Sequence, residues 1–192
     1  MLAVETFLQQ QKIHPRLKLI LVPRHVERSQ RLADSLAKRL RQTDARNIPM
    51  YYRSTLNGQA IPPPKRSFIL LVDVTGELAA LWGLATVAFV GGSLDGVRGG
   101  QNMLEPAAHG AAICFGPHTR NFHHEVSTLL KAEAAVVIHN GEELTEFVAQ
   151  CLDDPAFSRA LGANAKKVIE TNRGGTMLTA KRILEFLPAI SS

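Results

Sequence analysis

The sequence lacks the short motifs that identify many enzymes on their own. It contains no G-x-S-x-G nucleophile turn, no Walker phosphate loop and no G-x-G-x-x-G dinucleotide fingerprint. Its two cysteines, Cys114 and Cys151, lie in apolar segments and do not have CxxC spacing, so we expect two reduced, buried thiols. His123 and His124 are adjacent and have no cysteine or acid at ligand spacing, so we expect no zinc site.

Long apolar segments are missing as well. No apolar run reaches the roughly 18–20 residues of a membrane span, and the N-terminus has no apolar segment typical of a signal peptide. The formal net charge of +5 favours an anionic partner, such as a nucleotide, a nucleic acid or an acidic lipid. That indication is weak because the lysines and arginines are spread along the chain. With 192 residues, 45% of them hydrophobic, the chain is large enough to bury a core.

Apolar runs alternate with amphipathic stretches along most of the chain. The six runs expected to form strands cover residues 18–23, 48–52, 68–73, 86–92, 111–116 and 134–140. Strands that are apolar along their whole length and alternate with helices indicate a parallel sheet covered on both faces. We therefore predict a Rossmann-like α/β fold, in which ligands bind beyond the carboxyl ends of the strands. The proline-rich segment 57–66 is expected to be a surface loop.

Helical patterns separate the strands. The expected helices cover about residues 27–41, 75–82, a segment around Pro106, 122–131 and three C-terminal stretches that end near residue 188. In the first of them, Leu32, Leu36 and Leu40 share one face. Thr75 is expected to cap the second. Because proline is tolerated only in the first turn of a helix, Pro106 places the start of the next helix near residues 102–105.

Polar side chains follow three of the expected strands. The free N–H groups of the helix start near Asn102 and Glu105 would attract a phosphate. The carboxylate of Glu105 has the wrong sign for a phosphate, but it could accept hydrogen bonds from the hydroxyls of a ribose. The alternative is that Asn102 and Glu105 only cap the helix and complement its dipole. Arg24, which follows the first strand, could instead form only a surface ion pair. Glu77, at another helix start, could instead have only a helix-start role.

Four blocks of the sequence together resemble a known family. The blocks "LILVPRHVER", "DVTGELAALWGLATVAFVGGSL", "RGGQNMLEPAAHG" and "GPHTRNF", in this order and spacing, are similar to the C-terminal half of the Kdo transferases. These bacterial enzymes transfer 3-deoxy-D-manno-oct-2-ulosonic acid (Kdo) from its CMP ester to the lipid A precursor in lipopolysaccharide biosynthesis. The resemblance covers about residues 15–186. It implies the GT-B fold, with two Rossmann-like domains facing a cleft, of which this chain would be the C-terminal, donor-binding one.

The resemblance also implies a binding site. The positions that match the family's CMP-contacting blocks are Pro23, Arg24, Gly76, Glu77, Leu78, Asn102, Met103, Leu104 and Glu105. Further contacts to the donor are expected from His25, Ser93, Arg98 and His118, although the two histidines could instead be ordinary loop residues. No metal ion or other cofactor is expected, since the family is described as metal-independent. CMP-Kdo and the lipid A precursor are the implied partners, and nucleic acid is not among them.

The chain departs from the family pattern at three places and lacks one of the family's two domains. The loop Asp95-Gly96-Val97 is one residue longer than the family pattern, Gln101 replaces a usual histidine, and Met103 replaces a common proline. The family's N-terminal domain supplies the catalytic base, the acceptor surface and the membrane anchor, and these 192 residues do not contain it. We expect residues 1–192 to form one donor-binding domain, with helices 155–188 at its edge, that is soluble and inactive alone. The full-length enzyme would work at the cytoplasmic face of the inner membrane.

Two other functions fit the same residues. The chain could be a nucleotide-binding module without catalytic activity, or part of a different GT-B transferase that uses a nucleoside-diphosphate sugar. Affinity for CMP, UDP and ADP distinguishes the three hypotheses, because a Kdo transferase should bind only CMP.

Overall fold

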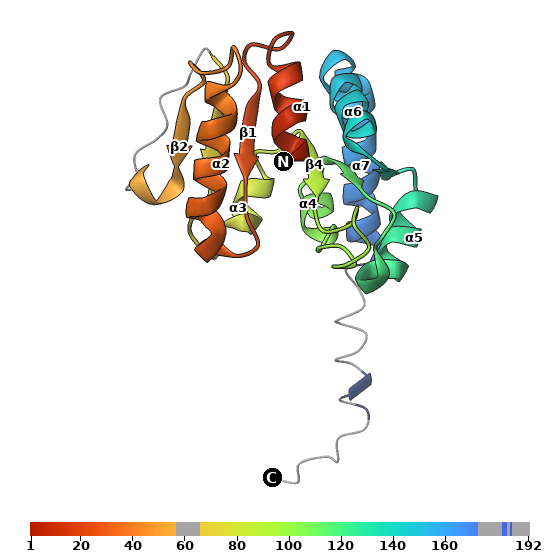
Figure 1. Cartoon of the computed structure of the whole chain (residues 1–192). Coiled ribbons are helices and arrows are strands. Elements are labelled where there is room, and N and C mark those ends of the chain that lie inside the picture. Colours follow the sequence, from red (N-terminus) through yellow and green to blue (C-terminus); the bar gives the residue numbers. More distant parts are fainter. Residues whose placement is uncertain (57–65, 173–181, 184, 186–192) are drawn as a thin grey trace, which may run out of the picture.

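Short parallel strands alternate with helices in the computed structural model, which describes residues 1–56, 66–172, 182, 183 and 185 (Figure 1). The strands are β1 (Lys18–Leu21), β2 (Met50–Tyr52), β3 (Phe68–Leu71), β4 (Val87–Val90), β5 (Ala112–Phe115) and β6 (Ala135–Val137). The α-helices are α1 (Leu2–Gln10), α2 (Ser29–Arg41), α3 (Leu78–Trp82), α4 (Leu104–Ala108), α5 (His123–Lys131), α6 (Gly141–Asp153) and α7 (Pro155–Asn172). Three 3-10 turns, η1 (Val26–Arg28), η2 (Arg53–Leu56) and η3 (Arg120–Phe122), follow β1, β2 and β5 along the chain. Each strand lies within a run that the sequence analysis assigned, so the predicted alternation of strands and helices is confirmed.

The strands form two three-stranded sheets, with the orders β1-β3-β2 and β4-β5-β6. All the pairings are parallel, as predicted. The sequence analysis predicted one sheet; within the described residues, β1 and β4 are not hydrogen-bonded to each other. No helix of this described part combines the length and the apolarity that crossing a membrane requires.

The central strand of each sheet is buried on both faces. Ile113 and Phe115 of β5 join a core cluster with α4, α5 and α7, whereas Ala112 and Cys114 join a second cluster with α6. In β3, Ile69 packs with α1 and α2, and its neighbours face the side of α3. This two-sided burial explains why these runs lack the alternating polar residues of a half-exposed strand. β1, in contrast, is only half-buried.

The two cysteines are free and buried, as the sequence analysis expected. Cys114 lies in β5 and Cys151 in α6, within the same core cluster. Burial raises the pKa of the Cys114 thiol far above its usual value, and it raises that of Cys151 to about 12. Both side chains therefore stay protonated and serve as small apolar groups of the core.

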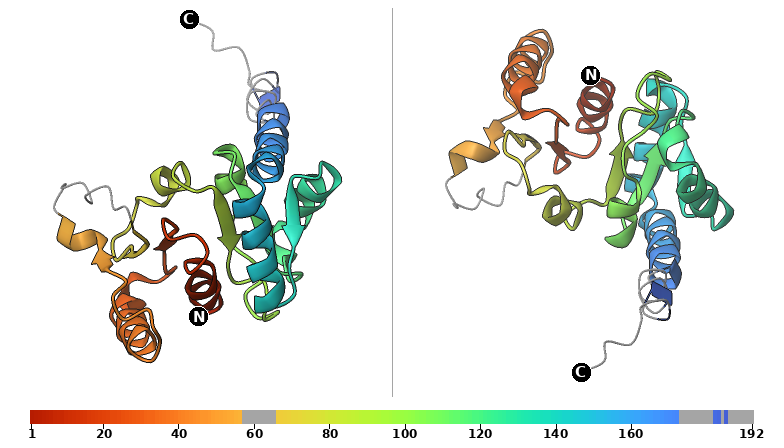
Figure 2. Two further views of the ribbon diagram at one scale, coloured as in Figure 1. Left: turned by 90° about the horizontal axis from the view of Figure 1, so that it is seen from above. Right: turned by 90° about the horizontal axis from the view of Figure 1, so that it is seen from below.

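Helix α1, which the sequence analysis missed, lies between the two halves of the molecule (Figure 2). Its apolar face, with Val4, Phe7 and Leu8, is buried against α2 and β3. On its other side, the hydroxyls of Thr6 and Thr145 in α6 are 2.9 Å apart. The helix thus links the two sheets. The signal was present in the sequence, because residues 4, 7 and 8 have the spacing of a buried helix face.

One expectation about the helices is wrong, and another lies outside the described residues. Thr75 does not cap α3: the helix begins at Leu78, and Glu77 occupies the N-cap position without a capping hydrogen bond. The physical reason is Gly76, whose φ of 86° turns the chain before the helix can start. Helix α7 does pack against α4 and β5. The helix expected after residue 172, and nearly all of the loop 57–66, lie outside the described residues.

Candidate functional site

The predicted site residues follow β1, β3 and β4, whose carboxyl ends face the same edge within each parallel sheet. Arg24 is exposed directly after β1, and Pro23 is half-buried. Within the described residues, the guanidinium of Arg24 has no ion-pair partner. His25 is also exposed, and its Nδ1 lies 3.3 Å from a carboxylate oxygen of Glu27. The edge therefore offers an uncompensated positive charge where the sequence analysis expected an anionic ligand.

The carboxylate of Glu105 is held in place by two donors. The side-chain amide of Asn102 donates to Oε1 at 3.0 Å, and the indole N–H of Trp82 donates to Oε2 at 3.3 Å. Each carboxylate oxygen can accept a second hydrogen bond, so acceptors remain for a ligand. Trp82 ends α3 and Glu105 lies in the first turn of α4, so this contact joins two of the predicted site segments. No sequence pattern indicated this role of Trp82.

Asn102 also shapes the start of α4. Its Oδ1 accepts a hydrogen bond of 3.0 Å from the backbone N–H of Leu104, the first residue of the helix. Met103, not Asn102, occupies the N-cap position, so Asn102 supports the helix start without being its N-cap. The helix itself has only five residues. Few peptide dipoles are aligned in so short a helix, so the attraction for a phosphate expected at this helix start is small.

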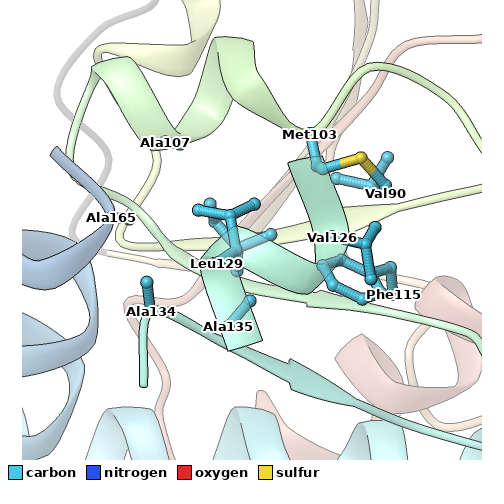
Figure 3. Close-up of a cluster of buried hydrophobic side chains, with 10 residues drawn as sticks. Val90, Met103, Ala107, Phe115, Val126, Leu129, Ala134, Ala135 and Ala165 are labelled. Atoms are coloured by element: carbon cyan, nitrogen blue, oxygen red, sulfur yellow. The ribbon is translucent and has the colours of Figure 1, made fainter. Parts of the chain in front are cut away.

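Met103 lies at the same turn but points away from the surface. Its side chain is fully buried in the core cluster beside Val90 (Figure 3). Only the backbone of this residue can therefore contact a ligand. A methionine at this position anchors the start of α4 to the core that β4 and β5 form.

A second cluster joins the end of β2 to the segment after β3. The guanidinium of Arg53 donates to the carboxylate of Glu77 at 2.7 Å. One residue further on, the backbone N–H and hydroxyl of Ser54 donate to the carboxylate of Asp73, at 2.8 and 2.5 Å. Glu77 is thus one partner of a half-buried ion pair, and Arg53 was missed because it lies 24 residues away in sequence.

The contact between Ser54 and Asp73 predicts a pH-dependent contribution to stability. Partial burial acts to raise the pKa of Asp73, but the hydrogen bonds from Ser54 outweigh it and lower that pKa below its usual value. A depressed pKa stabilises the fold above the group's ordinary pKa, and this stabilisation is lost as the pH falls through the folded-state value. We expect Ser54→Ala to lower the free energy of unfolding by about 0.5–1.5 kcal/mol at pH 7. The difference from the wild type, measured by urea unfolding, should shrink below pH 4; a constant difference would contradict this reading.

The loop between β4 and α4 depends on glycine. Gly92, Gly96, Gly99 and Gly100 all have φ between 69° and 84°, a region that other residues rarely adopt. Two side chains from the segment after β5 hold this loop, and the sequence analysis missed both. The guanidinium of Arg120 donates to the backbone oxygens of residues 96 and 97, at 3.4 and 2.8 Å, and the side-chain amide of Asn121 donates to that of residue 98 at 2.8 Å.

Ser93 has a structural role instead of the expected contact to the donor. Its side chain is fully buried. The hydroxyl donates to the carbonyl of Val90 at 2.9 Å and accepts from the N–H of Gly116 at 2.8 Å. It thereby ties the end of β4 to the end of β5. Arg98 and His118, the other expected contacts in this region, are both exposed.

Two of the pockets in the described part of the chain bear on the site. One, of about 260 Å³, is formed by the loops after β4 and β5, and its lining includes one predicted site residue, His118. The other, of about 460 Å³, lies between α1 and α6 and is lined by Glu5, Glu142 and Glu146. Three carboxylates in its lining disfavour an anionic nucleotide. The smaller pocket fits the predicted ligand better.

Within the described residues, no three His, Cys, Asp or Glu side chains gather as metal ligands would.

Comparisons with known proteins agree with the resemblance. No family model matches the chain. The chain is 33% identical over 175 residues to the 3-deoxy-D-manno-octulosonic acid transferase of Haemophilus influenzae, and 30% identical over 173 residues to that of Bordetella pertussis. A probable mitochondrial 3-deoxy-D-manno-octulosonic acid transferase of Arabidopsis thaliana is 30% identical over 160 residues. These matches cover 91%, 90% and 82% of this chain, but only 37%, 38% and 34% of the relatives. The chain thus spans little more than a third of their length.

A solved structure has the same architecture. The C-terminal CMP-Kdo binding domain of WaaA from Acinetobacter baumannii superimposes with a TM-score of 0.74 at 29% identity. The match covers 87% of this chain and 81% of that one. It confirms the predicted fold class, parallel sheets flanked by helices as in the C-terminal GT-B domain of WaaA. The chain is therefore a homologue of the 3-deoxy-D-manno-octulosonic acid transferases and has the fold of their C-terminal domain.

Proposed function

We propose that this chain is the donor-binding domain of a glycosyltransferase that moves Kdo from CMP-Kdo to a lipid A precursor. The observation that carries this proposal is the fixed carboxylate of Glu105, held by Asn102 and Trp82 at the start of α4. A preformed acceptor of this kind suits the two hydroxyls of a ribose. The similarity in fold to a CMP-Kdo binding domain supports the same ligand.

Each segment at the strand ends has its own part in this proposal. Arg24 would pair with the phosphate of CMP, because its charge is exposed and uncompensated in the described part of the chain. The backbone of residues 76–78 and of Met103 and Leu104 would line the nucleotide. Glu105 would accept hydrogen bonds from the ribose. Exposed His25, Arg98 and His118 are the candidates for contacts to the rest of the donor.

The proposed reaction would use groups from two domains. A carboxylate base in an N-terminal domain would deprotonate the acceptor hydroxyl, which attacks the anomeric carbon of Kdo as CMP departs. The negative charge on the departing phosphate grows during this step, and Arg24 would stabilise it. The full-length enzyme would work at the cytoplasmic face of the inner membrane, where its lipid acceptor lies.

Nucleotide selectivity tests the proposed function. In calorimetric titrations of the chain, CMP should bind while UDP and ADP should not. Comparable affinity for UDP or ADP would favour a GT-B transferase with a nucleoside-diphosphate sugar. Binding of CMP, but no effect on transfer when Arg24 and Glu105 are replaced in the full-length enzyme, would favour a module without a catalytic role.

Binding of CMP should not require a metal ion. Mg²⁺ is usually held by one or two carboxylates together with the phosphates of the ligand. Glu77 is paired with Arg53, and the ribose hydroxyls would take the acceptors of Glu105 that Asn102 and Trp82 leave free. We expect the dissociation constant of CMP to be the same with and without EDTA. Loss of binding in EDTA would contradict the metal-independent site.

A further inference from the structure

The pocket of about 260 Å³ has a basic lining that the binding of CMP does not explain. It lies between the loop after β4, which contributes Gly96 and Gly99, and the segment after β5. That second segment contributes His118, Arg120 and His123. No aspartate or glutamate lines the pocket among the described residues. Three side chains that can carry positive charge therefore meet in one small volume without a counter-charge in its lining.

The charge of Arg120 is fixed in this pocket. Its guanidinium donates to the backbone oxygens of Gly96 and Val97, at 3.4 and 2.8 Å. These two hydrogen bonds occupy two of its five N–H groups and do not neutralise its charge. Carbonyl oxygens orient the guanidinium without neutralising it, so its positive charge remains available to an anion.

Gly99 is what allows Arg120 to lie so close. A Cβ at this position would approach the Cγ of Arg120 to 2.7 Å and the amide nitrogen of Asn121 to 2.9 Å. The backbone of Gly99, with a φ of 74°, also favours glycine. On the other side, the ring of His118 lies against Gly96, where an added Cβ would be 3.6 Å from it. Since 3.6 Å is an ordinary contact distance, only Gly99 is required for the close approach of Arg120 to the loop.

We propose that this pocket binds the carboxylate of the sugar acid carried by the donor. The inference rests on the proposed function, because it requires a CMP-linked sugar acid as the ligand. Such a donor has two anionic groups, the phosphate and the sugar carboxylate, and the site has two separate places with positive charge. Arg24 after β1 takes the phosphate, and His118 and Arg120 take the carboxylate.

The position of the pocket fits this division. Gly96 and Gly99 belong to the loop that leads from β4 into Asn102 and Glu105, so the pocket adjoins the segment proposed for the ribose. The basic residues follow β5, the neighbour of β4 in the same parallel sheet, and therefore lie at the same edge. The pocket and the segment proposed for the ribose thus belong to one loop at one edge of the sheet, the arrangement that a single sugar-nucleotide ligand requires.

Comparison of CMP with CMP-Kdo isolates the contribution of the sugar acid. The dissociation constants of CMP and of freshly prepared CMP-Kdo should be measured by calorimetry for the wild type, His118→Ala and His118→Ala/His123→Ala. His124→Ala is the matched control, because this exposed histidine of α5 does not line the pocket. We expect the wild type to bind CMP-Kdo more tightly than CMP. The pocket variants should keep their affinity for CMP within about twofold and lose about tenfold or more for CMP-Kdo, the size of one charge-assisted hydrogen bond. His124→Ala should bind both ligands as the wild type does.

The other outcomes separate this inference from the proposed function. Equal losses for CMP and CMP-Kdo would mean that the pocket binds the phosphate, and unchanged affinities for both would mean that it lies outside the site. Either result overturns the inference and leaves the proposed function standing. If the wild type does not bind CMP at all, the proposed function itself is wrong.

Discussion

Replacing Glu105 by glutamine should lower the affinity for CMP about tenfold or more, because charge-assisted hydrogen bonds contribute roughly 1.5–3 kcal/mol each. The structure adds a second reason for a large effect. Both groups that contact this carboxylate, the amide of Asn102 and the indole of Trp82, are donors. A glutamine must turn its own NH₂ group toward one of them, which removes one hydrogen bond and misplaces the remaining acceptor.

A 2′-deoxy nucleotide serves as the control for this variant. The wild type should lose much of its affinity when the 2′-hydroxyl is removed, and Glu105→Gln should lose far less, because both changes remove the same interaction. Trp82→Phe is a second comparison: it removes one donor but leaves the carboxylate, so its effect on CMP affinity should be smaller. If Glu105→Gln binds CMP normally but melts several degrees lower, Glu105 is only a structural residue of α4.

Replacing Gly162 by alanine should strongly destabilise the fold. Gly162 lies in α7, and a Cβ there would be 1.9 Å from the backbone oxygen of Gly110 and 2.8 Å from its carbonyl carbon. Both neighbouring atoms belong to the backbone, so no side chain can move aside, and the helix must shift. Overpacking of this kind costs about 1–3 kcal/mol and sometimes more. Helix propensity alone would have the opposite sign, since alanine stabilises a helix interior by about 1 kcal/mol relative to glycine.

The sign of the change in the free energy of unfolding therefore shows whether overpacking or helix propensity dominates. The free energy of unfolding, from urea titration, should fall by about 3 kcal/mol for Gly162→Ala. Ala163→Gly, at the next and exposed position of α7, calibrates the propensity and should cost about 1 kcal/mol. A more stable Gly162→Ala variant would mean that α7 does not approach Gly110 as closely as described.

The features that sequence analysis predicted well depend on local patterns. The runs around Phe68–Leu71 and Ala112–Phe115 are apolar throughout because both faces of these strands are covered. The constraint on proline placed the start of α4 correctly, with Pro106 inside its first turn. Local reasoning was wrong at Thr75, where the positive φ of Gly76 delays the start of α3.

The features that it missed depend on contacts between distant residues. Trp82 meets Glu105 across 23 residues, Arg53 meets Glu77 across 24, and Arg120 meets the loop after β4 across a similar distance. Such pairs form only when several strands place their ends at one edge, and no spacing rule encodes which side chains then meet. The sequence also did not indicate the direction of the Met103 side chain, which turns into the core.

The most direct test of the account is to map where CMP binds. Backbone amide chemical shifts of ¹⁵N-labelled protein should be followed by NMR during a CMP titration. We expect changes concentrated at Arg24, at residues 76–78 and at residues 102–105. The larger pocket between α1 and α6 should not respond, because its lining is acidic. Changes concentrated around Glu142 and Glu146, with the strand ends unaffected, would contradict the proposed site.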